Sequence, residues 1–491
     1  MKNTEKQGTQ EAMDRRIFLK TVASACSLFV LSGGGIQAAG TIFSSETLEL
    51  KVGRRSRPNV VFILADDFGW SDVSHAVGYG YGGSDYYETP NLDRLAAQGM
   101  RFTDAYAACP VCSPTRASIM TGKYPARIHL TDWINGHERP NAKLKIPDWT
   151  HYMKLEEVTI AEALREAGYA TCHVGKWHLG DNPIYWPENQ GFDINKGGHS
   201  AGSPRGSGRY FTPYGNPRLD DGPAGEYLTD REGMEAAAFI EQNANRPFFL
   251  YMAHYAVHTP LMAKQQIIDK YKAKPATAEH KNATYAAMIQ SMDEAVGRVL
   301  NRLDELGIAE HTIVIFMSDN GGLLGPTSNV PLRGGKAQAY EGGIREPMII
   351  RWPDVVEPAS VCSEPVISTD FYPTILDMVG LKPRPLQHAD GLSLTPLLRQ
   401  QGSLDREAIY WHYPHYHTAN SHGPFGAVRT GDWKLIEFYE DMNVELYNLR
   451  TDLGETTDLT TAYPTKANEL RDMLHSWRAA VGAQMPTLNT P

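Results

Sequence analysis

Two long apolar runs constrain the fold of this chain more than any other feature. Residues 59–64 (NVVFIL) and 312–317 (TIVIFM) are apolar after their first residue and rich in β-branched side chains. Runs without polar alternation suit strands that are buried on both faces, as in a parallel sheet covered by helices. Shorter strand patterns are expected at 169–174 and 247–255. Helical patterns lie between them, at 90–98, 157–167, 227–243 and 284–306. The sequence therefore predicts an α/β fold with a large, mostly parallel sheet sandwiched by helices.

Both apolar runs are followed within two or three residues by a pair of oxygen-bearing side chains. These are Asp66 and Asp67 after the first run, and Asp319 and Asn320 after the second. Sites in open α/β sheets form at the carboxyl ends of strands, so we expect the two pairs to meet. Three carboxylates and an amide oxygen are hard ligands, which favour Ca²⁺, with Mg²⁺ as the alternative. A single pair would more often cap a loop or helix, but two pairs at matching strand ends indicate a metal site.

The run 112–122 (CSPTRASIMTG) predicts a short helix over 115–120, which begins near a cysteine. Pro114 fits the first turn of a helix, and Gly122 fits the residue that ends it. Cys112 then lies close to a helix N-terminus, which favours an anion, and Arg116 adds a permanent positive charge one turn later. A cysteine in such a run is most often a buried packing residue. Cys109 makes a C-x-x-C spacing with Cys112, so a redox pair is a minor alternative.

Three further stretches carry cations and imidazoles next to glycines or turns. Lys176 and His178 lie two residues apart in GKWHLG, His258 precedes Thr-Pro, and Lys336 lies in LRGGKAQAYEGG beside Arg333. The paired glycines of the last stretch would let the backbone approach an anion closely. The first two stretches are weak signals when taken alone, because such residues are common on surfaces.

Taken together, these motifs resemble those of the type I sulfatases, the formylglycine-dependent members of the alkaline phosphatase superfamily. The Cys-x-Pro-x-Arg sequence with its Thr-Gly resembles their signature, and the other motifs follow in the family's order between residues 59 and 351. The resemblance implies an alkaline-phosphatase-like fold and oxidation of Cys112 to formylglycine. It also implies roles for the motif residues: Asp66, Asp67, Asp319, Asn320 and the modified Cys112 bind the metal, Arg116 holds the formylglycine diol, and Lys176 and Lys336 clamp the sulfate.

The same resemblance implies that His178 and His258 are the acid and the base. The metal lowers the pKa of the diol, and the cations stabilise oxygens whose charge rises in the transition state. A histidine can protonate the leaving alkoxide. We assign that proton to His258, and to His178 the removal of the remaining diol proton, which expels sulfate and regenerates the aldehyde. The two roles could be exchanged.

Two stretches suggest a carbohydrate as the carrier of the sulfate. The run 127–136 resembles a group of bacterial sulfatases associated with glycans, and within it Trp133 could stack on a sugar and Asp132 could bond hydroxyls. The run 410–417 (YWHYPHYH) is rich in aromatic and imidazole side chains, and His412 or His415 is a candidate substrate contact, as is Arg333. The resemblance suggests sulfated galactose or N-acetylgalactosamine. Packing within loops and strands is the alternative interpretation of these residues.

The net charge and the length limit which partners and how many domains the chain can have. A formal net charge of −10, without a long basic run beyond the N-terminus, argues against nucleic acid as a partner. The chain is long enough for a catalytic domain (58–400) and a smaller C-terminal α+β subdomain (401–491). In the subdomain, strands are expected at 408–413, 426–438 and 444–448, and a helix at 466–481, with an antiparallel sheet.

The N-terminal residues predict export. The sequence DRRIFLK at 14–20 resembles a twin-arginine signal, so 1–39 is interpreted as a signal peptide and 40–57 as a linker. Its apolar segment is too short for a permanent membrane span. The expected partners are therefore the twin-arginine machinery and a formylglycine-generating or anaerobic sulfatase-maturating enzyme, acting before export. The protein would be periplasmic or secreted, exported after folding.

Three other functions compete with sulfate ester hydrolysis. A phosphatase or phosphonate monoester hydrolase of the same superfamily would use the same tetrahedral site. A sulfated-glycan-binding protein without turnover would lack a converted nucleophile or a metal ligand, yet every expected polar group is present. A metal-free cysteine hydrolase would leave the aspartates unexplained.

Overall fold

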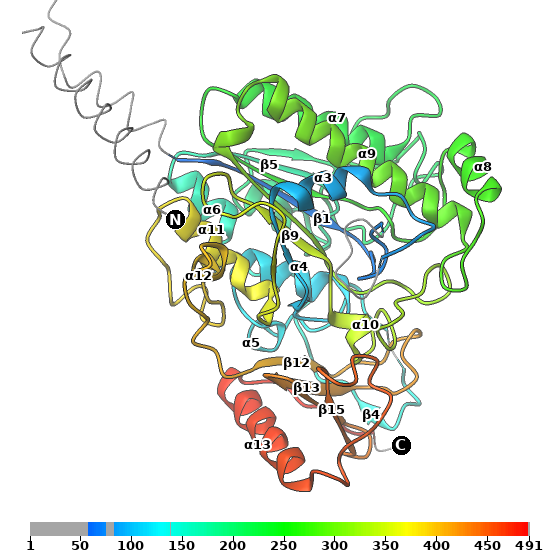
Figure 1. Ribbon diagram of the computed structural model, residues 1–491, viewed down its shortest axis with the longest axis vertical. Helices are drawn as coiled ribbons and strands as arrows, with labels where there is room; N and C mark the ends of the chain where they lie inside the picture. Colours follow the sequence, from blue (N-terminus) through cyan, green and yellow to red (C-terminus); the bar gives the residue numbers. More distant parts are fainter. Residues whose placement is uncertain (1–56, 75–82, 138, 490–491) are drawn as a thin grey trace, which may run out of the picture. The chain divides into compact units, whose positions relative to one another are not determined.

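An eight-stranded sheet lies at the centre of the computed structural model, which describes residues 57–74, 83–137 and 139–489 (Figure 1). From one edge to the other its strands are β10 (Ser360–Cys362), β2 (Met100–Phe102), β9 (Met348–Arg351), β8 (Thr312–Ser318), β1 (Asn59–Ala65), β7 (Phe248–Ala253), β5 (Ala170–Gly175) and β6 (Ile194–Lys196). Of these strands, β9 alone runs antiparallel to its neighbours. The predicted mostly parallel sheet is confirmed.

The two apolar runs form neighbouring strands in the middle of this sheet. β1 and β8 pair in parallel from Asn59 opposite Thr312 to Ala65 opposite Ser318, and every residue of both strands is buried. Because the two strands have equal length and register, they end at the same level. The residues that follow them therefore leave the sheet side by side.

Helices cover both faces of the sheet. Alternate residues of β1 belong to different cores: Val61 and Ile63 pack with one group of helices, and Val60 and Phe62 pack with the other. The first group is α3 (Pro90–Gln98), α7 (Leu228–Asn243), α8 (Gln265–Ala273) and α9 (Ala283–Glu305). The second is α4 (Cys112–Thr121), α6 (Ile160–Glu166), α11 (Phe371–Met378) and α12 (Thr395–Leu398). Figure 1 shows α7 and α9 on one side of the sheet and α4 and α11 on the other.

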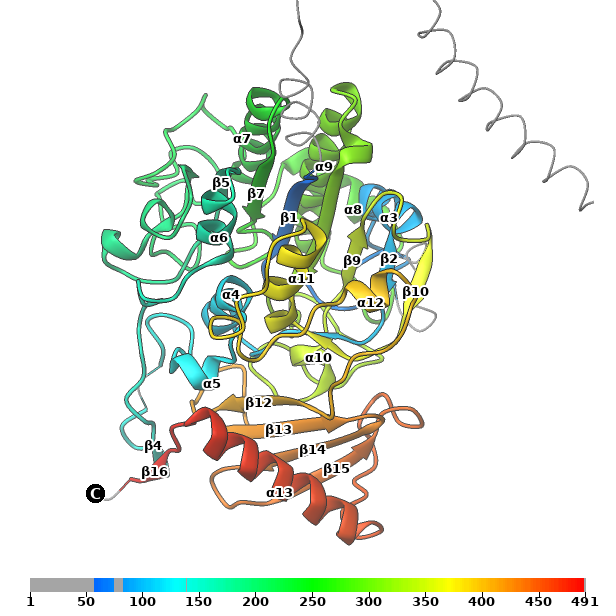
Figure 2. The same ribbon diagram turned by 90° about the vertical axis from the view of Figure 1, so that its left-hand side faces the viewer.

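A second, four-stranded sheet is antiparallel throughout, as predicted for the C-terminal part. Its strands in order are β12 (Ile409–Tyr413), β13 (Phe425–Thr430), β14 (Trp433–Phe438) and β15 (Val444–Asn448). The helix α13 (Pro464–Val481) packs on one face through Leu470 and Leu474 (Figure 2). On the other face, Trp411 packs in one cluster with Tyr106 and Ile344 of the larger part.

The prediction of a single strand at 426–438 is wrong. The structure has a hairpin there, with Thr430 paired with Trp433 across a two-residue turn. Gly431 has a φ of 53°, which is the left-handed region that glycine adopts without a steric penalty. The sequence carries a signal for this turn, because Gly431 and Asp432 lie within the polar run 429–432 (RTGD).

Short elements complete the described chain. They are β3 (Ala105–Tyr106) paired with β11 (Val366–Ile367), β4 (Leu144–Lys145) paired with β16 (Thr487–Leu488), α5 (Pro125–Ile128), α10 (Glu341–Ile344), and 3₁₀ turns at Pro183–Tyr185, Pro187–Asn189, Ala309–His311 and Ser368–Asp370. The β4–β16 pair returns the end of the chain to the larger part, and the domain boundary at residue 400 stays a prediction. No helix within the described residues has the length and apolar character needed to cross a bilayer. The expected signal peptide (1–39) and all but the last residue of the linker (40–57) lie outside the described residues.

Candidate active site

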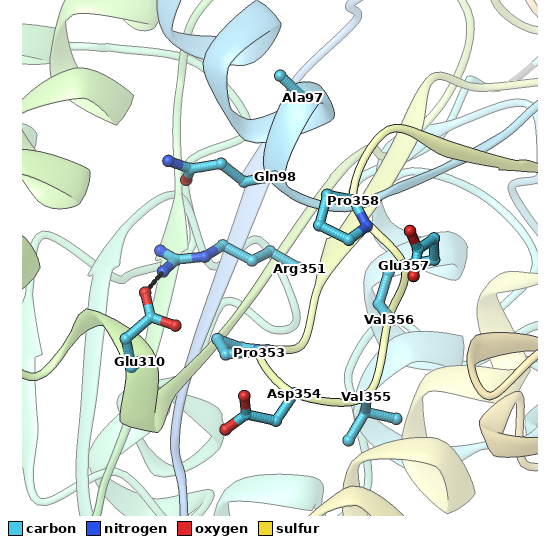
Figure 3. A pocket seen from close by; sticks show the side chains of 10 residues that line it. All are labelled: Ala97, Gln98, Glu310, Arg351, Pro353, Asp354, Val355, Val356, Glu357 and Pro358. Atoms are coloured by element: carbon cyan, nitrogen blue, oxygen red, sulfur yellow. Dashed lines mark hydrogen bonds and ion pairs between the residues drawn. The ribbon is translucent and has the colours of Figure 1, made fainter. Parts of the chain in front are cut away.

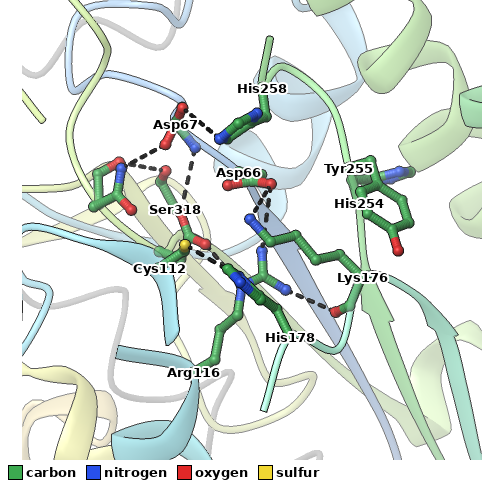
Figure 4. A network of polar contacts seen from close by, with 12 residues as sticks. Asp66, Asp67, Cys112, Arg116, Lys176, His178, His254, Tyr255, His258 and Ser318 are labelled. Carbon is green, nitrogen blue, oxygen red and sulfur yellow. Dashed lines mark hydrogen bonds and ion pairs between the residues drawn. The ribbon is translucent and has the colours of Figure 1, made fainter. Parts of the chain in front are cut away.

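The carboxyl ends of β8, β1, β7 and β5, four neighbouring strands, bring the predicted polar residues into one cluster (Figure 4). Leu64 of β1 lies opposite Ala253 of β7, which lies opposite Gly175 of β5. The chain therefore leaves these strands at one level. The residues that follow are Asp66 and Asp67 after β1, Asp319 and Asn320 after β8, Lys176 and His178 after β5, and His258 after β7.

The helix α4 adds Cys112 and Arg116 to this cluster. The predicted helix begins three residues earlier than expected, so Cys112 is its first residue, and it ends at Gly122 with a φ of 68°. The Cys112 Sγ lies 3.4 Å from the His178 Nδ1. Arg116 donates through Nε to Asp319 Oδ2 (2.8 Å) and through Nη1 to the Lys176 carbonyl (2.8 Å). Cys109 is a buried free cysteine in this structure, so the redox pair is not formed.

Buried ion pairs hold the carboxylates of the cluster. Lys176 Nζ lies 2.7 Å from Asp66 Oδ2, and Lys336 Nζ lies 2.7 Å from Asp67 Oδ1. With Arg116, three cations face three carboxylates, and all six side chains are at most 8% exposed. A divalent metal would leave such a set with a net positive charge, which suits an anionic ester.

The carboxyl groups titrate differently because their surroundings differ. Burial and the nearby charge of Asp66 together raise the pKa of Asp319 to about 6. Burial likewise raises the pKa of Asp66, against the charge of Lys176. Burial also acts on Asp67, but there the charges of Lys336 and His258 outweigh it and lower the pKa. Carboxyl groups with raised pKa values are those that a bound cation would return to the ionised form.

Two buried oxygens give a test of the predicted metal site. The Oδ1 of Asp66 and the Oδ1 of Asn320 have no hydrogen-bond partner among the described residues. Ligand atoms of Asp66, Asp67 and His258 lie within 4.8 Å of one another. Buried oxygens without partners are costly unless something binds them. The residues present therefore fit a hard divalent cation, and the four predicted oxygen ligands lie in one place.

The two predicted catalytic histidines face the cluster from different sides. The Nε2 of His178 contacts the Ile134 carbonyl and so carries the proton, which leaves Nδ1 as the acceptor that faces Cys112. His258 donates from Nδ1 to the Thr259 carbonyl (2.7 Å), and its Nε2 lies 3.6 Å from Asp67 Oδ2. Burial and the charge of Lys176 lower the pKa of His178, and burial and Lys336 lower that of His258 to about 3.

A cavity of about 290 Å³ opens onto this cluster and defines where a substrate can reach it. Its floor includes Asp67, Cys112, His178, His258 and Lys336, and its walls include Trp133, His137, Arg205 and His417. Of the predicted sugar contacts, Trp133 alone lines this cavity. The wall residues His137, Arg205 and His417 were not predicted. The only signals for them were the Gly- and Pro-rich loop around Arg205 and the imidazole-rich run that ends at His417.

The structure does not bring the other predicted sugar contacts to the cavity. His412 is buried between Tyr439 and the Gln484 carbonyl. Arg333 bonds the Tyr447 hydroxyl and lies 3.8 Å from the centroid of the Tyr340 ring. His415 is fully buried, and its Nε2 lies 2.8 Å from the Thr131 hydroxyl. Arg333 and His415 thus join the C-terminal part to the larger part, whereas the contacts of His412 stay within the C-terminal part.

Asp132 lies behind the cavity wall instead of facing the cavity. Its Oδ1 accepts hydrogen bonds from the Tyr413 hydroxyl and from the Trp133 amide, both at 2.9 Å. Its Oδ2 has no hydrogen-bond partner among the described residues, and the Nδ1 of His415 lies 3.7 Å from it. Burial raises the pKa of Asp132 to about 8. A neutral carboxyl at this position holds Trp133 without placing a negative charge beside the site.

A separate hollow of about 480 Å³ lies at the opposite end of the central strands (Figure 3). It is lined by Glu310, which precedes β8, and by Arg351, which ends β9. These two side chains pair at 3.0 Å. The hollow is separated from the cluster by the length of β8, about 23 Å for seven residues, and takes no part in the site.

Comparisons with known proteins agree with this geometry. Residues 58–381 match the family model described as "Sulfatase", and residues 335–480 match the model described as "N-sulphoglucosamine sulphohydrolase, C-terminal". A protein named sulfatase from Formosa agariphila is 34% identical over 90% of this chain and 92% of its own length. The human N-acetylgalactosamine-6-sulfatase is 34% identical over 72% of this chain and 68% of its own length. The crystal structure of Ps i-CgsB in complex with k-i-k-neocarrahexaose has a TM-score of 0.72 and 30% identity, and covers 86% of this chain and 93% of its own.

Replacing Asp132 by Asn should remove a pH-dependent loss of stability. The folded-state pKa of about 8 lies above the ordinary value of 3.8, so the unfolded chain releases its proton first. Stability is then highest below pH 3.8 and falls as the pH rises towards about 8. We expect the thermal midpoint of Asp132→Asn, measured by calorimetry, to rise relative to that of the wild type as the pH increases across this range. The control Asp181→Asn changes an exposed carboxyl. A difference in thermal midpoint between Asp132→Asn and the wild type that is the same at every pH would contradict a neutral Asp132.

Proposed function

The chain belongs to the sulfatase family, and on that premise we propose that it hydrolyses sulfate esters carried by a carbohydrate. The observation that carries the proposal is the buried cluster of three cations, three carboxylates and two imidazoles around Cys112, at the floor of a small cavity. Such a cluster recognises a tetrahedral anion and offers proton transfer at two points. The family implies a formylglycine and a divalent metal.

The proposed substrate is an O-sulfated sugar of the galactose or N-acetylgalactosamine type. Relatives named N-acetylgalactosamine-6-sulfatase support the sugar class, and the hexasaccharide bound to Ps i-CgsB supports a glycan. The cavity of about 290 Å³ is at the lower end of the range of about 300–1,000 Å³ typical of ligand sites, so it suits one sulfated sugar unit. The indole of Trp133 and the guanidinium of Arg205 are the wall groups suited to a ring and to polar substituents.

The cations of the cluster bind and orient the sulfate in this proposal. Lys176 and Lys336 contact its oxygens, and Arg116 holds the nucleophile at residue 112 against the strand ends. Formylglycine at this position supplies an aldehyde hydrate as the nucleophile. Asp66, Asp67, Asp319 and Asn320 would hold the metal, which supplies a Lewis acid, and their hard oxygens favour Ca²⁺ over Mg²⁺.

The two histidines move protons at different atoms. The Nδ1 of His178 faces residue 112 at 3.4 Å and accepts the proton from the nucleophile side. His258 is the more open of the two, with 18% of its side chain exposed, and it lines the cavity from which the leaving alcohol departs. The geometry thus favours the assignment of His258 to the leaving oxygen.

The alternatives from the sequence receive less support. The relatives reported above are named sulfatases, which does not favour a phosphatase or a phosphonate monoester hydrolase. A binding protein without turnover would not need two imidazoles placed for proton transfer. Export by the twin-arginine machinery after folding, and maturation by a formylglycine-generating or anaerobic sulfatase-maturating enzyme, stay part of the proposal and rest on the sequences at 14–20 and 112–122.

The first test is the mass of the tryptic peptide 102–116, taken from protein of the native compartment. We expect residue 112 to have lost its sulfur and gained an oxygen, with aldehyde reactivity towards a hydrazide. Cys109 in the same peptide is the internal control and should keep its thiol. An unmodified Cys112 together with full sulfatase activity would refute the formylglycine mechanism.

Replacement of His258 by Ala should affect sugar sulfates much more than activated aryl sulfates. A sugar alkoxide is a poor leaving group that needs a proton, whereas 4-nitrophenolate leaves without one. We expect kcat to fall by about 10²–10⁴-fold for the sugar sulfate and less than about tenfold for 4-nitrophenyl sulfate. His311→Ala, which removes an exposed imidazole before β8, is the control. Equal losses with both substrates would count against the role of His258.

Removal of divalent metal by a chelator should abolish turnover, and Ca²⁺ should restore it at a lower concentration than Mg²⁺. Mg²⁺ usually keeps several waters and takes one or two carboxylates, whereas this site offers three carboxylates and an amide oxygen, which suits Ca²⁺. Asn320→Ala should raise the restoring concentration by on the order of 10–100-fold, as loss of a site residue does. The exposed Asn245→Ala is the matched control. Restoration by Mg²⁺ at equal or lower concentration would overturn the choice of Ca²⁺.

A further inference from the structure

A second cavity of about 630 Å³ borders the catalytic cavity. His137 lines both, so the segment 134–137 is the partition between them. This partition is anchored on the catalytic side, where the Ile134 carbonyl accepts from His178 and the Ile134 amide donates to the Ser113 hydroxyl. The two cavities are therefore neighbours, and a ligand that reached past His137 from the catalytic cavity would lie at the second one.

The far wall of the second cavity is fixed by the end of the chain. β16 pairs with β4, and Asn489 donates to the carbonyls of Pro140 and Ala142 at 2.7 and 3.0 Å. The near wall includes Gly136, whose φ of 80° is left-handed and whose added Cβ would lie 2.9 Å from the Trp149 ring. The cavity is thus built by hydrogen bonds and close packing.

The charged groups of the second cavity favour an anion. Arg139 lies over the Tyr416 ring and bonds the His417 carbonyl, which fixes one cation at the rim. Lys145 also lines the cavity, and its ammonium has no hydrogen-bond or ion-pair partner within the described part of the chain. Asp148 is the one carboxylate among the lining residues that the structure describes, against these two cations. In a chain of net charge −10, two cations against one carboxylate among the described lining residues make a local excess of positive charge.

Aromatic side chains complete the lining. The rings of Trp149 and His151 are stacked, with centroids 3.8 Å apart, and the Trp149 ring meets His415 edge to face. Such a wall offers apolar area to a sugar ring, while the cations reach its substituents. The combination of an aromatic wall and two cations matches a sulfated or carboxylated sugar.

We propose that this second cavity binds the neighbouring sugar of an oligosaccharide substrate, and that this sugar carries a sulfate or carboxylate that Lys145 and Arg139 contact. The proposal rests on the proposed function, because it names what the same site holds beyond the sulfated unit. It assigns the chain a preference for oligosaccharides over single sulfated sugars. The catalytic cavity of about 290 Å³ binds the unit that reacts, and the larger cavity binds the rest.

The test compares affinity for ligands of different length. Calorimetry on the Cys112→Ala protein, which cannot turn the ligand over, measures Kd for N-acetylgalactosamine 6-sulfate and for the tetrasaccharides of chondroitin 6-sulfate and ι-carrageenan. We expect at least one tetrasaccharide to bind about tenfold or more tightly than the monosaccharide, the size of one charge-assisted hydrogen bond. Adding Lys145→Ala should remove most of this advantage and leave the monosaccharide Kd unchanged.

Matched controls separate this inference from the proposed function. Lys143 is exposed on the same segment and does not line the cavity, so Lys143→Ala should keep the length advantage. In the wild-type background, Lys145→Ala should raise KM for the tetrasaccharide without changing kcat/KM for 4-nitrophenyl sulfate. Equal affinity for all lengths, no binding of either tetrasaccharide, or an advantage that survives Lys145→Ala would overturn the inference. In each of these cases, turnover of 4-nitrophenyl sulfate would show that the proposed sulfatase function holds although the inference about the second cavity is wrong.

Discussion

The common level at which β8, β1, β7 and β5 end is the constraint on which the active site depends. Parallel pairing in matched register makes four chain segments, far apart in sequence, leave the sheet at one edge. Each segment needs to supply only one or two polar residues. Because all four strands are buried on both faces, their ends cannot shift without disturbing two cores at once. The positions of Asp66, Lys176 and Asp319 therefore follow from the packing of apolar residues several positions earlier.

Burial of so many charges makes the cluster dependent on its own internal pairing. Each of the three carboxylates has a cation at 2.7 or 2.8 Å. Removing one partner would leave a buried charge without compensation, which costs about 3–5 kcal/mol in other proteins. A second buried network holds the segment that carries Lys336: Lys434 of β14 lies 2.8 Å from both Glu341 and Glu455. The C-terminal sheet thus positions the segment of Lys336 as well as the cavity wall.

Sequence patterns predicted the central sheet and the polar cluster because both depend on short-range signals. An apolar run with acids at its end is visible within ten residues, and sheet geometry brings such ends together. The cavity wall depends on loop conformation, for which no comparable periodicity exists. In the run 410–417, the strand β12 ends at Tyr413 before Pro414, so alternation gives no guide beyond that residue. His412 and His415 turn into the protein, whereas His417 reaches the cavity. The hairpin at Gly431 differs from these loops, because its Gly-Asp turn within the polar run 429–432 is visible in the sequence.

This division between strand ends and loops also explains where specificity can reside. In the proposed function, the groups that act on the sulfate come from strand ends and from the N-terminal half of α4, which the two hydrophobic cores fix. The groups that face the rest of the substrate come from three loops, represented by Trp133, Arg205 and His417. Loops tolerate change that a buried strand does not, because their side chains support no core. Changes in these loops can therefore alter which sugar is accepted while the reaction stays the same. Asp132 limits this freedom, since its hydrogen bonds tie the Trp133 loop to Tyr413 of the second sheet. A change in the Trp133 loop therefore needs a matching change in the part of the second sheet that carries Tyr413.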